Sequence, residues 1–367
     1  SISHRALILA GLAEGASALD RLNPGVDVAS TAACLEMMGV RIDRSADRAV
    51  VHGRAGTLRC PTGVLDCGNS GTTMRLLAGV IASQEFTATL DGDESLRNRP
   101  MRRVAIPLRG LGARVEGPDN AEHAPLIVTG PVSRGGSFSS PVASAQIKSA
   151  ALLAGALGGK RVRVEEPGMS RDHTERMLNA FGIECRFGDG FALVDPEPGQ
   201  RLRAVDLTVP ADPSAAALLC ACAAAVPGSR IELDDVLLNP RRTGFLEVLS
   251  RMGISCESVA SAESGGEKVG RLDITAPESF GPTHIAREEV PRLVDEVPAL
   301  AALAAFGEGT TVFEGVGELR VKESDRLASI SELLAAFGVE SRVDDDRLEV
   351  VGGAPRFLSL IHISEPT

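Results

Sequence analysis

The chain has 367 residues, of which 44% are hydrophobic and 24% charged, and its formal net charge is −11. This length predicts two or three domains, and the composition excludes a disordered chain. No apolar run is long enough to span a membrane, and a net negative chain without Trp or Tyr argues against nucleic-acid binding.

The chain opens on the stretch SISHRALILAG, which predicts an apolar helix with no strand before it. Ser1 and Arg5 stand four residues apart, so they share one face of that helix. The stretch lacks the basic region and cleavage site of a signal peptide, so we expect a cytoplasmic protein.

The chain repeats a phrase in which a helix ends in glycine and a short strand follows. The five glycines lie 70 to 85 residues apart, at Gly39, Gly112, Gly182, Gly253 and Gly338. Glycine past the last helical turn fits a left-handed C-cap. A second helix-to-strand passage recurs between them, which gives each copy two helices and about four strands. We therefore predict an α/β protein with three copies in a first domain, 1–209, and two in a second, 210–357.

The stretch LDCGNSGTTMRLLAG, residues 65–79, places a glycine-rich polar turn before an apolar helix. Gly68 and Gly71 allow a ligand to approach the backbone closely, and Asn69 or Ser70 can cap the helix. Free N–H groups and the positive end of the helix dipole favour an anion at such a turn. A helix cap that holds no ligand is the alternative.

Polar and charged residues recur at the starts of other predicted helices. They are Arg97, Arg99, Arg102 and Arg103 in LRNRPMRR, Ser144 and Gln146 in SAQIKSA, Ser170 and Arg171 in MSRDHTE, and Lys322, Glu323 and Arg326 in VKESDR. Each set alone is typical of a capped helix with a solvated charged face. Their recurrence in the copies predicts one anionic ligand surrounded by several helix starts. A helix dipole contributes only about 0.3 to 1 kcal/mol to an exposed anion, and a charge-assisted hydrogen bond about 1.5 to 3 kcal/mol, so the cations matter most.

Two carboxylates are candidates for acid–base catalysis. Asp295 lies just ahead of Pro298, whose ring suits the first position of a helix. It is either a favourable charge at a helix start or a catalytic group. Glu323 follows Lys322, and a neighbouring cation with partial burial can tune a carboxylate for proton transfer. Without that environment Glu323 would be an ordinary surface charge.

The seven cysteines are an odd number, which argues against a set of disulfides. Cys220 and Cys222 lie in an Ala-rich helical run, so we expect them to be small buried residues. No other Cys or His stands at ligand spacing near this Cys-x-Cys pair, so a metal there is not favoured.

The final stretch, RFLSLIHISEPT, has neither the glycine-capped helix nor the strand of a further copy. We expect residues 358–367 to be a non-native tail. Because a sixth copy and a first strand are missing, we expect the chain to be cut at both ends.

Together these motifs resemble the 5-enolpyruvylshikimate-3-phosphate (EPSP) synthase family, in a bacterial subgroup that often tolerates glyphosate. The resemblance runs from Ser1 to about Pro355 and is carried by SISHRALILAG, GNSGTTMRLLAG, LRNRPM, SAQIKSAALLAG, EPGMSRDHTERML, VDEVPALA and LRVKESDR. It implies two domains of βαβαββ units, an inside-out α/β barrel, with the active site between them. It also implies transfer of the enolpyruvyl group of phosphoenolpyruvate to the 5-hydroxyl of shikimate 3-phosphate, without metal or organic cofactor.

The resemblance implies a role for each matching residue. Shikimate 3-phosphate would be held by Ser1, Arg5, Ser144, Gln146, Ser170, Arg171, Asp295 and Lys322. Phosphoenolpyruvate would be held by Asn69, Gly71, Arg99, Gln146 and Arg326. The catalytic residues would be Asp295, Glu323 and Lys322. Asp295 would take the hydroxyl proton, and Glu323 would protonate the methylene carbon.

The sequence also departs from the family. The lysine that precedes Ser1 in the family and the His-Arg motif after the fifth copy are absent. Loss of one electrostatic partner costs about 10² to 10³ in rate, so we expect a nearly inactive chain.

We expect a monomer that binds small molecules and neither nucleic acid nor membrane. The alternatives are UDP-N-acetylglucosamine enolpyruvyl transferase, whose loop cysteine has no counterpart in DESLRNRPMRR, and a noncatalytic anion-binding fragment.

Overall fold

The computed structural model describes residues 1–45, 47–322 and 324–353, so the predicted tail, 358–367, lies outside it. The chain divides into two compact units. Unit 1 comprises Ser1–Pro210 together with Glu263–Glu267, and unit 2 comprises Ala211–Ala262 and the described residues from Lys268 onward. None of the helices that the structure describes has both the length and the apolar content that crossing a bilayer requires.

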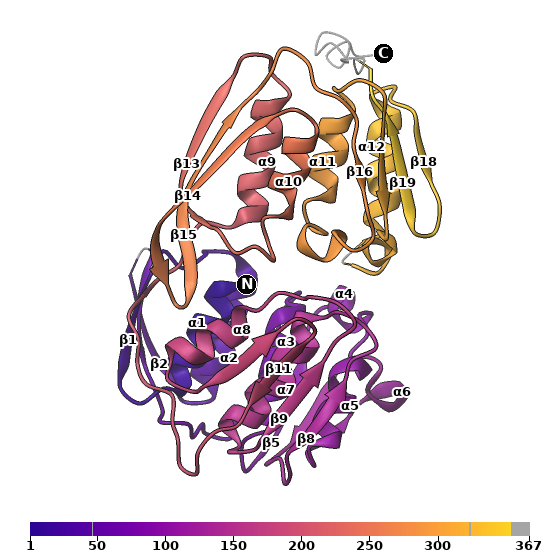
Figure 1. Ribbon diagram of the computed structural model, residues 1–367. Helices are drawn as coiled ribbons and strands as arrows, with labels where there is room; N and C mark the ends of the chain where they lie inside the picture. Colours follow the sequence, from indigo (N-terminus) through magenta and orange to yellow (C-terminus); the bar gives the residue numbers. More distant parts are fainter. Residues whose placement is uncertain (46, 323, 354–367) are drawn as a thin grey trace, which may run out of the picture. The chain divides into compact units, whose positions relative to one another are not determined.

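The described part of unit 1 forms three four-stranded sheets that share one connectivity (Figure 1). In each sheet two strands pair in parallel, and the second of them begins an antiparallel run of three. The sheets are β12 (Leu207–Thr208), β1 (Ala16–Asp20), β3 (Arg48–His52) and β2 (Arg41–Ser45); β4 (Leu65–Asp66), β5 (Thr87–Asp91), β7 (Leu126–Thr129) and β6 (Arg114–Glu116); and β8 (Gly136–Ser139), β9 (Val162–Glu165), β11 (Phe191–Val194) and β10 (Cys185–Gly188). Because β12 is the last strand of unit 1 and pairs with its first, the unit closes on itself.

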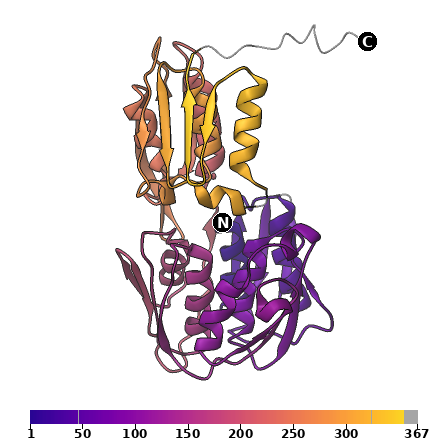
Figure 2. The same ribbon diagram turned by 90° about the vertical axis from the view of Figure 1, so that its right-hand side faces the viewer.

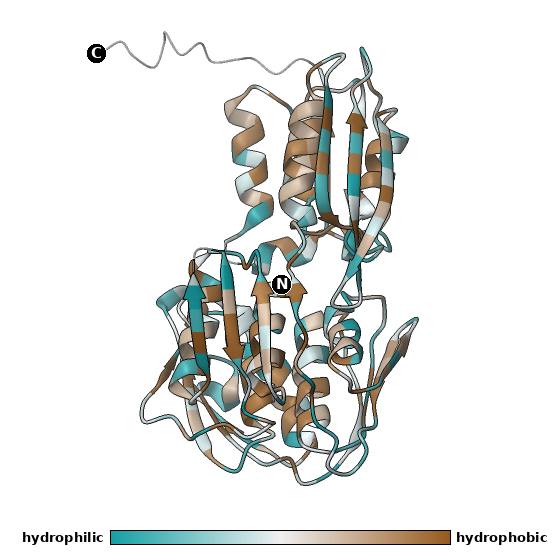
Figure 3. Ribbon diagram, turned by 90° about the vertical axis from the view of Figure 1, so that its left-hand side faces the viewer, coloured by the Kyte–Doolittle hydropathy of each residue, from teal (hydrophilic) through white to brown (hydrophobic). Residues whose placement is uncertain are grey.

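Three helices of unit 1 lie inside its sheets. α1 (Ile2–Leu12), α3 (Gly71–Ile81) and α7 (Ala145–Leu157) are buried along most of their length. A helix that is apolar all round needs partners on every side, and α3 contacts both α1 and α7. The flanking helices are α2 (Val26–Met37), α4 (Glu94–Arg97), α5 (Arg102–Gly110), α6 (Pro118–Ala121) and α8 (His173–Ala180). Strands β1, β3, β5, β7 and β9 alternate between buried residues and residues that are less buried, and Figure 3 shows such alternation by hydropathy, so each sheet turns one face to the helices. This is the expected inside-out α/β arrangement.

Unit 2 repeats the same connectivity once in full. Its sheet, seen face on in Figure 2, has the order β16 (His284–Ile285), β17 (Thr310–Glu314), β19 (Arg347–Val351) and β18 (Ser341–Val343), with α11 (Val297–Ala304) and α12 (Arg326–Ala336) between successive strands. The other sheet contains β13 (Arg230–Leu237), β15 (Glu267–Thr275) and β14 (Ser255–Ser264), with α9 (Pro213–Ala224) and α10 (Gly244–Arg251). Helices α9, α10 and α11 lie between these two sheets and share one apolar core with them (Figure 1). Two 3-10 turns, Val290–Arg292 and Gly317–Val321, complete the described elements.

The glycine repeat has the predicted structural role. The five glycines at 39, 112, 182, 253 and 338 have φ between 70° and 94°, the left-handed region in which a Cβ is strained. Each lies two residues beyond the end of a helix, namely α2, α5, α8, α10 or α12, and a strand follows within three residues. The prediction of two helices and about four strands per copy is therefore confirmed where the copies are complete.

The cysteines are all free thiols. Cys220 is buried as expected, but the expectation for Cys222 is wrong because Cys222 is exposed. Only one face of α9, which carries Ala217, Cys220 and Ala221, packs into the core of unit 2. Cys222 lies on the other face with Leu218, which is 56% exposed.

Candidate functional site

The polar turn before α3 has the predicted capping geometry. Ser70 is the N-cap, and its hydroxyl oxygen accepts a hydrogen bond from the backbone N–H of Thr73 at 3.1 Å. Gly71 begins the helix, and a Cβ added there would lie 2.9 Å from Nη1 of Arg75 and 3.1 Å from Nη1 of Arg99. Two guanidinium groups therefore lie against the backbone of this helix start, where the dipole also favours negative charge.

The side chain of Arg99 is held by the turn itself. Its Nη2 donates to Oδ1 of Asn69, and Nδ2 of Asn69 donates to Oδ2 of Asp93 at 2.7 Å. Asp93 is also the N-cap of α4 and accepts from the backbone N–H of Leu96 at 2.8 Å. These donors, Leu96 first and Asn69 second, lower the pKa of Asp93. An ionised Asp93 fixes the amide of Asn69 so that its oxygen faces Arg99.

Arg75 contacts the predicted residue Gln146, although none of the sequence motifs points to Arg75. It lies in the middle of α3 and is 8% exposed. Its Nη1 donates to Oε1 of Gln146 at 2.6 Å, and its Nη2 donates to the carbonyl oxygen of Pro100 at 3.2 Å. Nε2 of Gln146 in turn donates to Oγ1 of Thr72 at 3.0 Å. Arg75 therefore ties the starts of α3 and α7 together, and the sequence signal for it is a lone charge inside an apolar helical run.

Arg5 is buried in unit 1 and is only 4% exposed. Its Nε donates to Oγ1 of Thr174 at 2.7 Å, and its Nη2 donates to Oγ of Ser149 at 2.9 Å. Its Nη1 donates to the carbonyl oxygen of Ser1, the N-cap of α1, at 3.2 Å, so these two residues share a face as predicted. Ser144 is the N-cap of α7, and its side chain makes no capping hydrogen bond to that helix.

The predicted residues Ser170 and Arg171 precede α8, whose N-cap is Asp172. Ser170 is buried, and its Oγ donates a hydrogen bond to Oε2 of Glu166 at 2.7 Å. Arg171 is partly exposed. Apart from Arg99, which lies between α4 and α5, the predicted substrate-binding residues of unit 1 therefore lie at the starts of α1, α3, α7 and α8. Hydrogen bonds join these four helices.

The predicted residues of unit 2 form a second cluster. Oδ1 of Asp295 lies 3.1 Å from Nη1 of Arg326 and 3.8 Å from Nζ of Lys322. Each of the three side chains is about a quarter exposed, at 25%, 29% and 23% in that order. Asp295 precedes Glu296, the N-cap of α11, and Arg326 is the first residue of α12. Because α11 begins at Val297, Pro298 occupies its second position. Glu323 lies outside the described residues.

A buried group of metal-type donors stands beside the predicted residues of α8. Asp172, His173 and Glu267 have ligand atoms within 4.8 Å of one another. Nδ1 of His173 lies 2.6 Å from Oε1 of Glu267, and Nη2 of Arg176 donates to Oδ2 of Asp172 at 2.9 Å. A protein cation thus already compensates part of the negative charge. The sequence does not reveal this group, because Glu267 comes from the tip of the β14–β15 hairpin.

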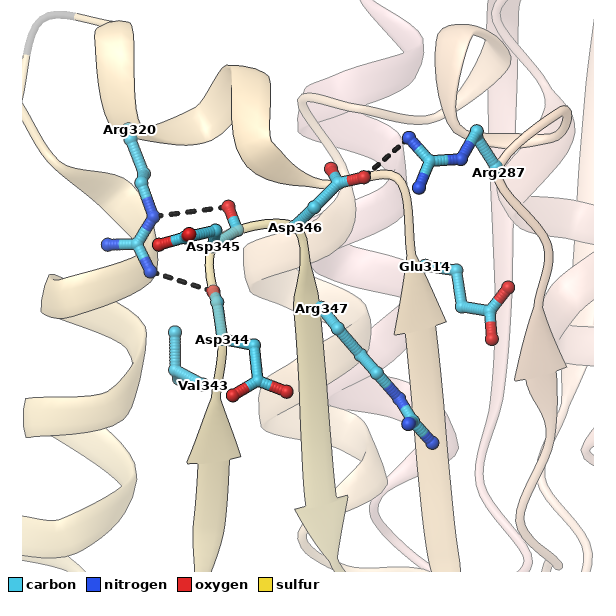
Figure 4. Close-up of a pocket in the computed structure, with 8 residues that line it drawn as sticks. All are labelled: Arg287, Glu314, Arg320, Val343, Asp344, Asp345, Asp346 and Arg347. Atoms are coloured by element: carbon cyan, nitrogen blue, oxygen red, sulfur yellow. Dashed lines mark hydrogen bonds and ion pairs between the residues drawn. The ribbon is translucent and has the colours of Figure 1, made fainter.

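A hollow of about 710 Å³ in unit 2 lies apart from the predicted residues, none of which lines it. Figure 4 shows that two of its arginines, Arg287 and Arg320, have partners within the lining. Arg320 donates to the carbonyl oxygens of Asp344 and Asp345 at 2.8 and 3.3 Å, and Arg287 pairs with Asp346 at 2.5 Å. The lining carries more carboxylates than guanidinium groups, namely Glu314, Asp344, Asp345 and Asp346 against Arg287, Arg320 and Arg347. The hollow is therefore a weaker candidate for an anion than the helix starts of unit 1.

His4 gives unit 1 a predictable dependence on pH. Burial, followed by nearby positive charge that includes Arg5, lowers the pKa of His4 to about 3, whereas the unfolded value is 6.5. Only the unfolded chain takes up this proton between those values, so stability is lost as the pH falls below about 6.5. We expect a loss of about 2 kcal/mol in the free energy of unfolding from this residue between pH 7 and pH 5.

The variant His4→Gln tests this expectation by denaturant titration at several pH values. Its free energy of unfolding should fall less steeply between pH 6 and pH 4 than that of the unmodified chain, by about 1.4 kcal/mol per pH unit. Equal slopes for the two proteins would contradict the assignment.

Comparisons with known proteins cover nearly the whole chain. The sequence model of the family described as EPSP synthase (3-phosphoshikimate 1-carboxyvinyltransferase) matches residues 1–361, which include part of the predicted tail. The 3-phosphoshikimate 1-carboxyvinyltransferase of Bacillus subtilis (strain 168) is 44% identical over 353 residues, which are 96% of this chain and 82% of that protein. The protein of the same name from Xanthomonas euvesicatoria pv. vesicatoria (strain 85-10) is 48% identical over 356 residues, 96% of this chain and 80% of that one.

A solved structure of an EPSP synthase from Acinetobacter baumannii has a TM-score of 0.85 and 36% identity to this chain, covering 96% of it and 79% of that chain. The matched residues make up 82% and 80% of these two relatives, and the expected truncation at both ends stays a prediction. The relatives carry the name of the shikimate enzyme, so the UDP-N-acetylglucosamine alternative is not favoured. Since the family sequence model and relatives at this identity span almost all of the chain, the protein belongs to the EPSP synthase family.

Proposed function

We propose that this chain catalyses the reaction for which its family is named, with the motif residues as its binding and catalytic groups. The enolpyruvyl group of phosphoenolpyruvate passes to the 5-hydroxyl of shikimate 3-phosphate, and phosphate is released. The observation that carries the proposal is the match of the family across residues 1–361. The convergence of Arg5, Arg75 and Arg99 on helix starts of unit 1 supports it, because each guanidinium can bind a phosphate or carboxylate through two parallel hydrogen bonds.

The residues proposed for the two substrates come from both units. For shikimate 3-phosphate they are Ser1, Arg5, Ser144, Gln146, Ser170, Arg171, Asp295 and Lys322. For phosphoenolpyruvate they are Asn69, Gly71, Arg99, Gln146 and Arg326. The hydrogen bonds from Arg99 to Asn69 and from Arg75 to Gln146 support the second set, because they fix polar groups in place before an anion binds.

The chemistry requires a base and an acid in turn. In the proposed first step Asp295 takes the proton of the 5-hydroxyl as its oxygen bonds to C2 of phosphoenolpyruvate, and Glu323 gives a proton to C3. The tetrahedral adduct then loses phosphate from C2 and a proton from C3, which restores the double bond. The contacts of Arg326 and Lys322 with the carboxylate support this role for Asp295, because they hold its side chain in one place.

Calorimetry and a phosphate-release assay test the proposal on the unmodified chain. Shikimate 3-phosphate should bind, and phosphate should appear only when phosphoenolpyruvate is also present. The predicted low activity makes the binding measurement necessary beside turnover. Binding of UDP-N-acetylglucosamine in place of shikimate 3-phosphate, or binding of neither, would refute the assignment. We also propose that the protein is a cytoplasmic monomer. Light scattering of the purified protein tests whether it is a monomer.

Gly71→Ala is expected to weaken the binding of phosphoenolpyruvate more than the binding of shikimate 3-phosphate. The new methyl group would meet the guanidinium ends of Arg75 and Arg99 at 2.9 and 3.1 Å, so both must move from their places at the helix start. Displacing one charge-assisted hydrogen bond should raise KM for phosphoenolpyruvate about tenfold. Gly110→Ala is the control, because a Cβ at Gly110 meets no atom within 4 Å. Equal KM values for the two variants would contradict the role of Gly71.

A further inference from the structure

Lys148 is a fully buried lysine at the centre of unit 1. It lies in α7, two residues after Gln146, and its side chain is 2% exposed. Its Nζ lies 2.7 Å from Oε1 of Glu166 and 2.8 Å from Oε1 of Glu175, and both of these carboxylates are equally buried. A buried charge is retained only where its partners compensate the loss of water, so this ion cluster constrains every segment that enters it.

One partner of Lys148 holds the segment that carries Ser170 and Arg171. Glu166 follows β9, and its carboxylate accepts a hydrogen bond from Oγ of Ser170, which lies 2.9 Å from Oε1 and 2.7 Å from Oε2. The backbone N–H of Ser170 donates to the same Oε1 at 3.2 Å. Lys148 and Ser170 thus share one carboxylate, so the position of the lysine determines where this loop lies before α8.

The other partner of Lys148 aligns α8 with α7 directly beside Arg5. Glu175 pairs with Lys148, and the next residues along the two helices, Thr174 and Ser149, are hydrogen-bonded to each other at 2.6 Å. Both hydroxyl groups accept hydrogen bonds from Arg5. The ion pair and the hydroxyl pair are therefore adjacent contacts between the same two helices.

The charges of the cluster also matter. Burial raises the pKa of Glu175, and Lys148 opposes that rise. Without the ammonium, two carboxylates would lie in the interior beside residues proposed to bind a phosphate dianion. That arrangement would repel the substrate as well as destabilise the fold.

We propose that Lys148 and Glu166 are positioning residues for shikimate 3-phosphate, which they do not touch. Lys148 fixes the position of Glu166, and Glu166 fixes the position of Ser170. The positions of Arg171 and of the start of α8 then depend on this segment. The inference rests on the proposed function, because it takes Ser170 and Arg171 as substrate-binding residues. In this inference the SAQIKSA motif has two roles. It contributes binding residues itself, and through Lys148 it supports the segment that carries Ser170 and Arg171.

Three neighbouring glutamates allow a matched test. Glu166→Gln keeps the shape of the side chain but removes the charge and one of the two oxygens that accept from Ser170. Glu175→Gln removes the other carboxylate of the same lysine and leaves Ser170 untouched. Glu165→Gln is the surface control, because Glu165 is 51% exposed and pairs with Arg163 at 2.9 Å.

Binding of shikimate 3-phosphate is measured by calorimetry on each variant of the 367-residue chain, with a melting curve for each. Glu166→Gln should raise Kd about tenfold, which corresponds to one lost charge-assisted hydrogen bond. Glu175→Gln should change Kd less than threefold, and Glu165→Gln should leave both Kd and Tm unchanged. KM for phosphoenolpyruvate, measured at saturating shikimate 3-phosphate, should stay within twofold for all three variants.

The possible outcomes separate this inference from the proposed function. If the unmodified chain does not bind shikimate 3-phosphate, the proposed function fails and the inference falls with it. If the unmodified chain binds and Glu166→Gln binds equally well, the inference alone is overturned, even when Tm falls. Should Glu166→Gln not fold, Glu166→Asp keeps the charge but withdraws the carboxylate from Ser170. An unchanged Kd for Glu166→Asp would overturn the inference in the same way.

Discussion

Replacing Asp295 by asparagine is expected to lower kcat by at least about 100-fold, because a positioned general base contributes about 10² to 10⁴ in rate. Asparagine has the same size and can still accept a hydrogen bond from Arg326, which lies 3.1 Å from Oδ1 of Asp295. It cannot take up the hydroxyl proton. Steady-state phosphate release at saturating concentrations of both substrates measures the effect.

The control for this variant is Asp345→Asn. Asp345 is exposed in unit 2, and the hydrogen bond from Arg320 reaches its backbone carbonyl and not its carboxylate. This substitution should leave kcat unchanged. A fall in kcat of less than threefold for Asp295→Asn, with substrate binding retained, would remove Asp295 from the role of base.

Replacing Arg75 by leucine is expected to have the largest effect on stability, a loss of about 3 kcal/mol or more. Two hydrogen bonds from a buried guanidinium disappear, and Oε1 of Gln146 and the carbonyl oxygen of Pro100 lose this donor. Hydrogen bonds that involve a charged group contribute about 1.5 to 3 kcal/mol each. Because Gln146 also loses its fixed orientation, KM for phosphoenolpyruvate should rise.

Denaturant titration followed by circular dichroism measures this loss, since a chain without Trp or Tyr gives little intrinsic fluorescence. Hydrogen exchange of the amides of α3 and α7 assigns the loss to unit 1. Arg97→Leu is the control, because Arg97 is 54% exposed and its pair with Asp91 lies at the surface. Exposed pairs contribute about 0.2 to 1 kcal/mol, so equal losses for the two variants would contradict the role of Arg75.

Local features of the fold could be predicted because their causes lie within a few residues of one another. A helix followed by glycine and an alternating strand has the same local physics in each copy, so the caps at Gly39 and Gly253 followed from the pattern. The N-caps Ser70 and Ser144 followed from polar residues that precede apolar runs. The motif resemblance predicts which helix starts carry the substrate-binding residues, and that assignment stays a prediction.

Long-range polar contacts could not be predicted in this way. Lys148 and Arg75 lie within apolar helical runs. A single charged residue there interrupts the apolar pattern, and the sequence does not show which distant residue pairs with it. The partner Glu175 is separated from Lys148 by two elements, β9 and the loop before α8. Composition alone favours a buried Cys222, although only one face of α9 is covered.

The tip of the β14–β15 hairpin has a consequence for how the protein can be divided. Glu263–Glu267 belongs to unit 1, and Glu267 provides the carboxylate that contacts the buried imidazole of His173. A gene segment that stops at Pro210 would therefore encode an incomplete folding module. During synthesis on the ribosome, the N-terminal half must wait for residue 267 to emerge before its interior is finished, which makes the order of translation part of its assembly.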